Sequence, residues 1–257
     1  MPFTLSHPAA VLPFGRTKLA FSALIAGALA PDIGYFLTFS SQHAESHSLT
    51  GLFLICLPAG LLMLLVFHKL MKAPLLALLP ASHQERLYPY AQGFHFLPAS
   101  RFGLIVISLL IGSLSHLIWD SFTHKTGWVV LRVAALEGTL RPFHHYPVYK
   151  FLQHSSGVLG LAILVMAYAH WYREAKPSAV KRPRMASATR LTIAFVMLAG
   201  ACVAALLRTI SPLISWQTIR GNVVQATIAF VSIFVVEMIV FSIIWQLAQV
   251  RKLRLMS

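Results

Sequence analysis

The chain is poor in acidic residues and in charge of any kind. Its 257 residues include 7 Asp and Glu against 21 Lys and Arg, and charged residues make up only 11%. Because soluble domains carry roughly 25% charged residues, this composition excludes an ordinary soluble domain. Together with 57% apolar residues and a mean hydropathy of +0.72, it indicates an integral membrane protein.

Cysteine is almost absent as well. Cys56 and Cys202 each lie within an apolar run, where a free thiol behaves as a small hydrophobic side chain. Two such residues exclude a framework of disulfides. We also find no repeat of fixed period, which excludes a repeat architecture.

Basic residues are in excess, and the net charge is +14. In a soluble domain this charge would suggest nucleic acid, but here most Lys and Arg residues lie in connections between apolar runs, above all in the linker at 173–190. The positive-inside rule explains that pattern, so we expect the bilayer and no nucleic acid as partner. We predict a multi-pass membrane protein with this linker in the cytoplasm.

Apolar runs divide the chain into membrane segments. Five are long enough to cross a hydrocarbon core of roughly 30 Å: about 49–70, 103–122, 155–173, 190–210 and 223–248. A sixth run, 17–39, is interrupted by Pro31 and Asp32. We therefore predict an all-α polytopic membrane helical bundle of about six membrane segments.

Residues 4–14 are too short to span, and the turn PFGRT follows them. We expect an N-terminal re-entrant hairpin that brings His7 beside Asp32. The basic linker suggests three parts, namely a His- and Asp-bearing membrane domain at 1–173, a cytoplasmic linker at 174–189 and a C-terminal pair of transmembrane helices at 190–257.

The chain has only two aspartates, Asp32 in LAPDIGYF and Asp120 in HLIWDSF. An ionised carboxylate in such a context costs several kcal/mol unless a cation or hydrogen-bond donors compensate it. Each Asp could simply cap a helix or pair with a loop Lys. However, His116 and Asp120 lie four residues apart on one helix face, with His124 one turn further, and imidazole with carboxylate suits Zn²⁺.

Alternation of the spans places Asp32, His47, Asp120 and His154 at the same membrane face, which the basic residues indicate to be extracytoplasmic. His47 and His154 each stand just before a predicted membrane helix and are followed by serines that can cap it. Helix N-termini favour anions, so metal ligands beside them would suit a phosphoester. The serines could equally be caps alone.

Several motifs carry a family resemblance: MPFTLSHPAAVLP, GALAPDIGYF, SHSLTGLF, SHLIWDSFTHKTGW and PVYKFLQHSSGVLG. With them, residues 1–173 resemble a bacterial membrane family known as domain of unknown function 4184. That family is similar to the LexA-regulated inner-membrane metal-dependent hydrolases and, distantly, to zinc-dependent phospholipase C.

The resemblance implies one or two divalent ions, zinc above all. It implies His116, Asp120 and His47 as ligands of the first ion, with His7 as a further ligand. Asp120 could bridge two ions, and Asp32 could be a general base or a ligand. A second ion would be served by His124 and His154. The phospholipases have a later His-x-x-x-Glu, whereas Val158 stands four residues after His154, so a full trinuclear zinc site is not expected.

We thus expect a membrane-embedded metal-dependent hydrolase of a phosphoester, such as a phospholipid or an envelope intermediate. Arg141, His145 and Lys150 are candidates for binding the substrate phosphate, and they could equally line a headgroup interface. An alternative is a cation or proton carrier that uses Glu237 in the last span. Another is a non-catalytic membrane protein with a structural metal site.

Overall fold

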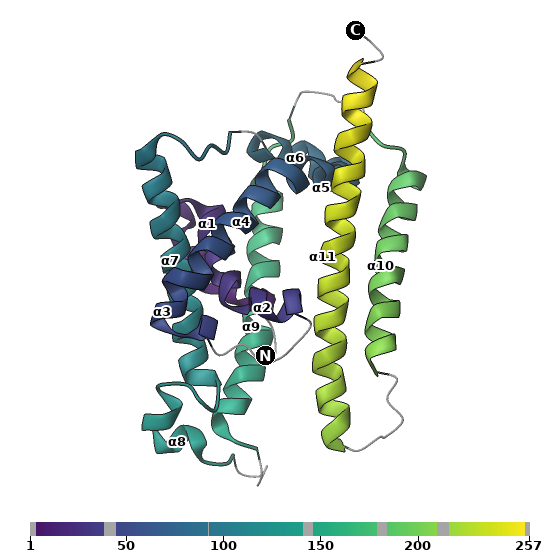
Figure 1. Cartoon of the computed structure of the whole chain (residues 1–257). Helices are drawn as coiled ribbons and strands as arrows, with labels where there is room; N and C mark the ends of the chain where they lie inside the picture. The colour runs from purple at the N-terminus through teal and green to yellow at the C-terminus, as the bar shows by residue number, and fades with distance from the viewer. Residues whose placement is uncertain are drawn as a thin grey trace. The chain divides into compact units, whose positions relative to one another are not determined.

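The computed structural model is built from helices over the residues that it describes, which are 4–38, 45–91, 93–140, 146–178, 184–209 and 216–254 (Figure 1). Six helical stretches in these residues are long and apolar enough to cross a membrane: Phe21–Thr38, Leu49–Leu78, Ala99–Thr123, Val148–Glu174, Ser187–Thr209 and Val223–Arg251. No strand occurs in this part of the chain. The prediction of an all-α polytopic bundle is confirmed, and the chain is a multi-pass membrane protein.

The elements follow one another in this order: the 3-10 helix η1 (Thr4–Arg16), α1 (Phe21–Leu29), the 3-10 turn η2 (Ala30–Asp32), α2 (Ile33–Thr38), the 3-10 turn η3 (Glu45–His47), α3 (Leu49–Gly51), the π-helical η4 (Leu52–Cys56), α4 (Leu57–Leu65), the π-helical η5 (Val66–Met71), α5 (Lys72–Leu78), α6 (Ala81–Ala91), α7 (Ala99–Thr123), the 3-10 turn η6 (Val130–Arg132), α8 (Ala134–Glu137), α9 (Val148–Glu174), α10 (Ser187–Thr209) and α11 (Trp216–Arg254).

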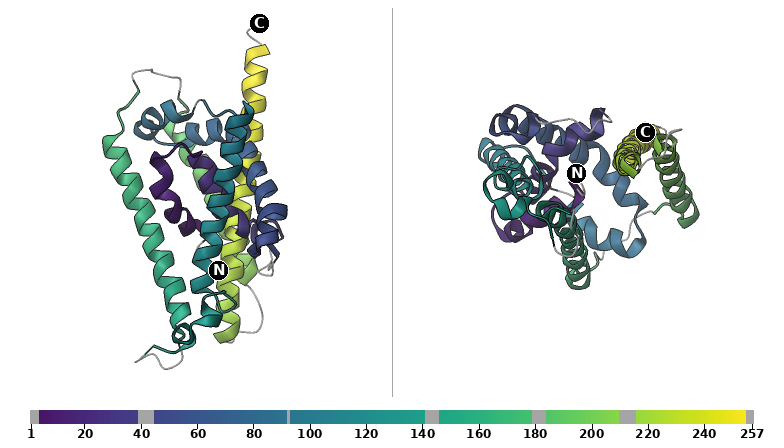
Figure 2. Two further views of the ribbon diagram at one scale, coloured as in Figure 1. Left: turned by 90° about the vertical axis from the view of Figure 1, so that its left-hand side faces the viewer. Right: turned by 90° about the horizontal axis from the view of Figure 1, so that it is seen from below.

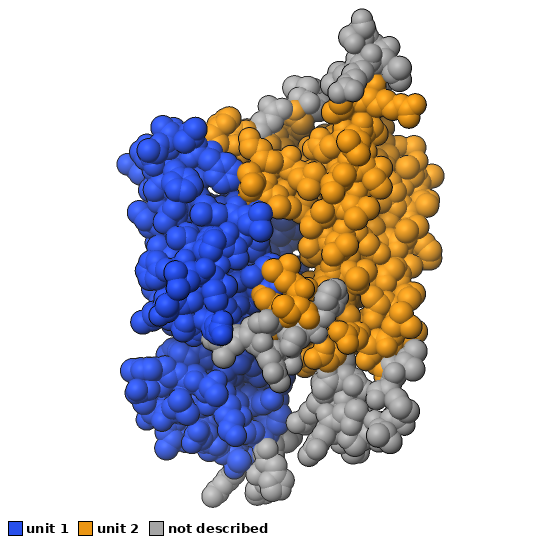
Figure 3. Space-filling model, in the orientation of Figure 1, with its two compact units in different colours: residues 1–33, 43–64, 96–170 blue, residues 34–42, 65–95, 171–257 orange. Residues whose placement is uncertain are grey.

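The helices group into two compact units (Figure 3). The first comprises residues 1–33, 43–64 and 96–170, and the second comprises 34–42, 65–95 and 171–257. In the second unit α10 and α11 run side by side (Figures 1 and 2). This unit also holds residues 65–95, which the sequence alone assigned to the N-terminal domain.

Glu237 belongs to the contact between α10 and α11. Its carboxylate lies where a side chain at Gly200 would be, so the glycine makes room for it. Its Oε2 atom is buried and has no hydrogen-bond partner among the described residues. Glu237 is thus a packed member of the second unit, whereas the two aspartates lie in the first.

The first span is interrupted where the sequence predicts. Helix α1 ends at Leu29, and the turn η2 carries Pro31 and Asp32 before α2 begins. Proline has no N–H to donate to the helix, so it favours a break at this position. The Pro31 carbonyl accepts a hydrogen bond from the Ser46 hydroxyl at 2.7 Å. The turn leaves the Asp32 side chain buried in the first unit.

The N-terminal segment η1 folds back onto the first span, as the expected hairpin requires. It packs against both α1 and α7, and Thr4, Ser6, His7 and Val11 are buried in these contacts. The Thr4 hydroxyl donates to Asp32, and His7 contacts Asp120.

Helices α1 and α7 approach each other closely in the first unit (Figure 2). A Cβ atom added at Gly27 would overlap the Leu109 carbonyl oxygen, and one added at Gly112 would overlap the Leu24 carbonyl oxygen. Backbones can come this near only where side chains are missing. The contact lets the Ser113 hydroxyl donate to the Gly27 carbonyl at 3.0 Å.

This contact predicts opposite results for two Gly→Ala substitutions in α7. Alanine favours a helix by about 1 kcal/mol over glycine, but at Gly112 the added methyl would force the helices apart and cost about 1–3 kcal/mol. We expect Gly112→Ala to lower the thermal unfolding midpoint in detergent, by roughly 2–4 °C for each kcal/mol.

Gly103→Ala is the matched control, because nothing lies within 4 Å of a Cβ at Gly103. It should leave the midpoint unchanged or raise it. Equal midpoints for the two variants would contradict the close α1–α7 contact.

Candidate metal centre

Helix α7 presents the first two residues of the site. His116 and Asp120 are one turn apart, and the side chain of His116 is 0% exposed against 12% for Asp120. The helix ends at Thr123, and the His124 N–H bonds to the Asp120 carbonyl at 3.0 Å. The predicted ligand row of α7 therefore continues only as far as the C-cap of the helix.

The ring of His116 is oriented by the neighbouring helix α1. Its Nδ1 atom lies 2.7 Å from the Ala28 carbonyl oxygen, so Nδ1–H donates to that oxygen and Nε2 is the nitrogen that a metal ion would use. Nε2 is buried without a hydrogen bond, 3.3 Å from Asp120 Oδ2 and 3.6 Å from Asp32 Oδ1. Metal binding requires a lone pair on this nitrogen, and a cation between Nε2 and the two carboxylates would remove the repulsion that such a lone pair would otherwise meet.

His7 from η1 is oriented in the same way. Its Nδ1 lies 3.3 Å from the Thr4 carbonyl oxygen, and its Nε2 lies 3.1 Å from Asp120 Oδ1. The rings of His7 and His116 stack in parallel with centroids 3.8 Å apart. Both Nε2 atoms therefore border the Asp120 carboxylate.

His47 approaches from the turn before α3. Its Nε2 lies 3.2 Å from Asp32 Oδ1 and 3.4 Å from Asp120 Oδ2. Its Nδ1 lies 3.2 Å from the Ser46 hydroxyl oxygen, whose proton is given to the Pro31 carbonyl. The next residue, Ser48, caps α3 by accepting from the Gly51 N–H at 2.9 Å, as the sequence predicts.

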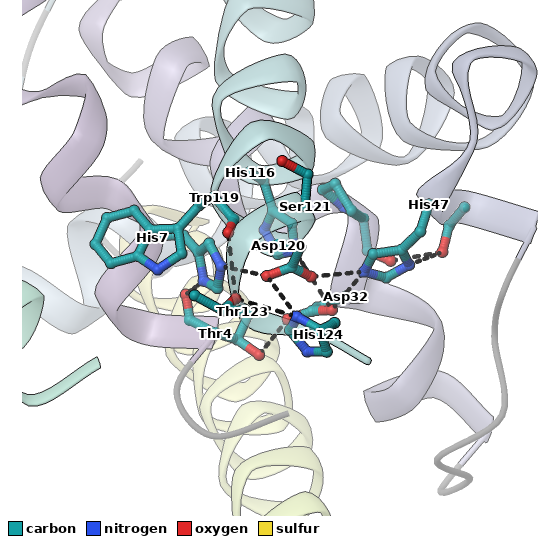
Figure 4. Close-up of polar contacts among 12 residues, drawn as sticks. Thr4, His7, Asp32, His47, His116, Trp119, Asp120, Ser121, Thr123 and His124 are labelled. Carbon is teal, nitrogen blue, oxygen red and sulfur yellow. Dashed lines mark hydrogen bonds and ion pairs between the residues drawn. The ribbon is translucent and has the colours of Figure 1, made fainter. Parts of the chain in front are cut away.

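Asp32 completes the group from the turn η2. The Thr4 hydroxyl donates to its Oδ2 at 2.5 Å. Its Oδ1 is left facing the Nε2 atoms of His47 and His116. Figure 4 shows the rings of His7, His47 and His116 turned toward the carboxylates of Asp32 and Asp120.

The ligand atoms form two overlapping sets. His7, His116 and Asp120 make one and Asp32, His47 and His116 the other, with the atoms of each set within 4.8 Å of one another. Imidazole nitrogen with carboxylate oxygen suits Zn²⁺ and similar ions. In metal sites the second ring nitrogen of a ligating His is commonly bound to a carbonyl or another acceptor, as it is in these three residues. The residues present thus fit a divalent metal.

Burial decides how the site can be reached. His116 is fully buried, whereas the side chains of His47 and His124 are 21% and 29% exposed. Among the described residues of the cluster, His47 and His124 are therefore the most accessible to solvent.

The remaining candidate residues are placed differently. His124 contacts Asp120 and Gln153. His154 is exposed on α9 with its ring stacked near Tyr146, at 6.2 Å between centroids, and it belongs to neither ligand set. Lys150 lies half-buried in the first turn of α9. The candidates Arg141 and His145 lie outside the described residues.

The expectation that His154 precedes a helix is wrong. Helix α9 begins at Val148, directly after Pro147, and His154 lies within it. Proline favours the start of a helix, and Pro147 is the signal in the sequence for the start of α9 at Val148. Ser155 binds the Phe151 carbonyl at 2.8 Å instead of capping.

Reading the sequence for metal ligands missed the residues that orient them. These are Thr4, Ser46 and Gln153, together with the Ala28 carbonyl. Thr4 and Ser46 stand close to predicted histidines in SHP and ESHS, which is the only signal the sequence carries for them. Gln153 likewise stands next to a predicted histidine, His154 in QHSSG, whereas nothing in the sequence marks Ala28.

The two aspartates change the pKa of His47. Burial alone would lower it, but the hydrogen bonds to Asp120 and Asp32 and the charges of both carboxylates outweigh burial and raise the pKa to about 9. For His124 burial prevails, and its pKa is lowered. In the metal-free site, His47 therefore carries a proton at neutral pH.

This shift predicts proton release on metal binding. Because a ligating imidazole must be neutral, Zn²⁺ binding at pH 7.5 should release about one proton from His47. Release should fall as the pH rises through 9, where the ring is already neutral. Calorimetric titration in two buffers of different ionisation enthalpy measures the number of protons.

The His47→Gln variant, which has no titrating ring, is the control and should release correspondingly fewer protons. Identical proton release by wild type and His47→Gln at pH 7.5 would contradict the assignment.

Comparison with known proteins adds the family. A family model described as domain of unknown function (DUF4184) matches residues 1–243, a range that contains every residue of the cluster. None of the curated proteins and none of the solved structures compared matches the chain.

Proposed function

The chain belongs to the DUF4184 family, and we propose that it is a membrane-embedded, divalent-metal-dependent hydrolase of a phosphoester. The observation that supports this proposal is the convergence of three imidazole Nε2 atoms on two buried carboxylates. Such a donor set suits zinc. The ion would be held by His116 and Asp120 together with His7 and His47.

A bound divalent ion would polarise the phosphoryl group and lower the pKa of a water molecule at the site. The protein's part begins with Asp32. Its Oδ2 is occupied by the Thr4 hydroxyl, which leaves Oδ1 to accept a proton as general base. The orientation of the Asp120 carboxylate is fixed by contacts on both of its oxygens. Oδ1 contacts His7 and His124, and Oδ2 contacts His47 and His116.

The substrate class follows from charge and from the membrane. Two aspartates balance one divalent ion, so an anionic phosphoester needs further cations. For that role we propose Lys150, together with Arg141 and His145. A phospholipid or a lipid-linked envelope intermediate would present its phosphate at the depth where α7 ends and α3 begins.

We propose that the cluster faces the extracytoplasmic side of the bacterial inner membrane. The reason is that the basic linker at 173–190 follows the C-terminal end of α9, whereas Gln153, which contacts the cluster, lies near the N-terminal end of that helix.

Metal content tests the first half of the proposal. Protein purified in detergent should contain about one or two equivalents of a divalent metal, and His116→Ala and Asp120→Ala should each lose at least about ten-fold in affinity. His170→Ala is the matched control, because His170 is exposed on α9 and should leave metal content unchanged. Wild type that binds no zinc when zinc is supplied would overturn the proposal.

Catalysis is tested at Asp32. With metal bound, the protein should hydrolyse bis(p-nitrophenyl) phosphate or phosphatidic acid in mixed micelles, and a chelator should abolish the reaction. Asp32→Asn should lower kcat by about 10²–10⁴-fold, since the base is lost. Metal content measured on the same sample separates this loss from loss of the ion. An unchanged kcat in Asp32→Asn would exclude Asp32 as the base.

A further inference from the structure

His124 is oriented in the opposite sense to the other three histidines of the cluster. In His7, His47 and His116, Nε2 faces the carboxylates, while Nδ1 faces an acceptor outside the carboxylate pair. In His124, Nδ1 faces Asp120 Oδ1 at 3.3 Å and Nε2 points away from the pair. This reversal decides which nitrogen of His124 can carry a proton.

Two contacts place the proton of His124 on Nδ1. The Thr123 hydroxyl lies 3.2 Å from Nδ1 and gives its own proton to the Trp119 carbonyl, so its oxygen can only accept from the ring. Asp120 Oδ1 is likewise an acceptor. A lone pair on Nδ1 would thus face two acceptors, whereas an N–H there donates to them.

The other ring nitrogen is occupied by Gln153. The amide Nε2 of Gln153 lies 2.9 Å from His124 Nε2 and donates to it. Gln153 is buried in α9, and that helix is joined to α7 one turn further on, where Trp119 Nε1 donates to the Ser156 hydroxyl at 3.1 Å. The face of α9 that carries Gln153 and Ser156 therefore holds the His124 ring at Nε2, the nitrogen that does not face Asp120.

We infer that His124 is a positioning residue, which donates from Nδ1 to Asp120 and is locked by Gln153, and that it is not a metal ligand. Both ring nitrogens are used, so no lone pair is left for an ion. The donated hydrogen bond fixes the Asp120 carboxylate toward the three ligand rings. This inference rests on the proposed metal centre and replaces the expectation that His124 serves a second ion.

Spectroscopy on the wild-type chain gives the direct test. With ¹⁵N-histidine and ¹¹³Cd²⁺ in place of zinc, the ring nitrogens of His116 should show coupling to cadmium, and those of His124 should show none. In the metal-free protein, the ¹⁵N shifts of His124 should report a protonated Nδ1 and an unprotonated Nε2. Cadmium coupling at His124, or a proton on Nε2, would overturn the inference.

Substitutions test the same point through metal affinity. The amide nitrogen of an asparagine can take the place of histidine Nδ1, and that of a glutamine the place of Nε2. His124→Asn should therefore keep Zn²⁺ affinity within about three-fold, while His124→Gln should weaken it by about 10–100-fold without changing the number of ions bound. Loss of one bound equivalent in both variants would make His124 a ligand.

Gln153→Leu removes only the hydrogen bond from Gln153 to His124 Nε2 and should weaken Zn²⁺ binding by several-fold. Ser155→Ala, two residues further along α9 and exposed, is its control and should bind as wild type does. Equal affinities for these two variants would count against the lock. If the wild-type protein binds neither Zn²⁺ nor ¹¹³Cd²⁺, the proposed function fails, and the His124 proton position in the metal-free protein still decides this inference.

Discussion

The close approach of α1 and α7 is the constraint on which the candidate metal centre depends. Gly27 and Gly112 have no side chains to separate the two backbones, and the Ala28 carbonyl oxygen comes within 2.7 Å of His116 Nδ1. That bond orients His116, which belongs to both sets of converging ligand atoms. Because small residues let helices associate within a bilayer, the packing that forms the bundle also orients its central ligand.

Two carboxylates are buried beside one another in this site, and their charges must be compensated by the groups around them. An isolated ionised carboxylate inside a protein costs several kcal/mol, and Asp32 and Asp120 are both buried. The Thr4 hydroxyl and His47, which is protonated at neutral pH, supply part of the compensation. A divalent cation would supply the remainder, which is why a metal centre accounts for this cluster better than separate helix caps do.

The ligand histidines are oriented by different groups. His7 and His116 are held by backbone carbonyls, which move only if a helix moves. His47 is held through the Ser46 hydroxyl, and its side chain is 21% exposed. The two buried rings are thus oriented by the backbone, and the more exposed ring is oriented by a side chain.

The sequence by itself determined what depends on neighbouring residues. Hydropathy over about 20 residues predicts a membrane span, Pro31 predicts the break before Asp32, and the helical period places His116 and Asp120 on one face. Local signals can also compete: the serines after His154 predict a helix start there, whereas α9 begins directly after Pro147. Only the tertiary structure decided which residues meet across the chain. Thr4 with Asp32, His7 with Asp120 and Gln153 with His124 are separated by 28, 113 and 29 residues, and such pairs form through helix packing, which no local pattern records.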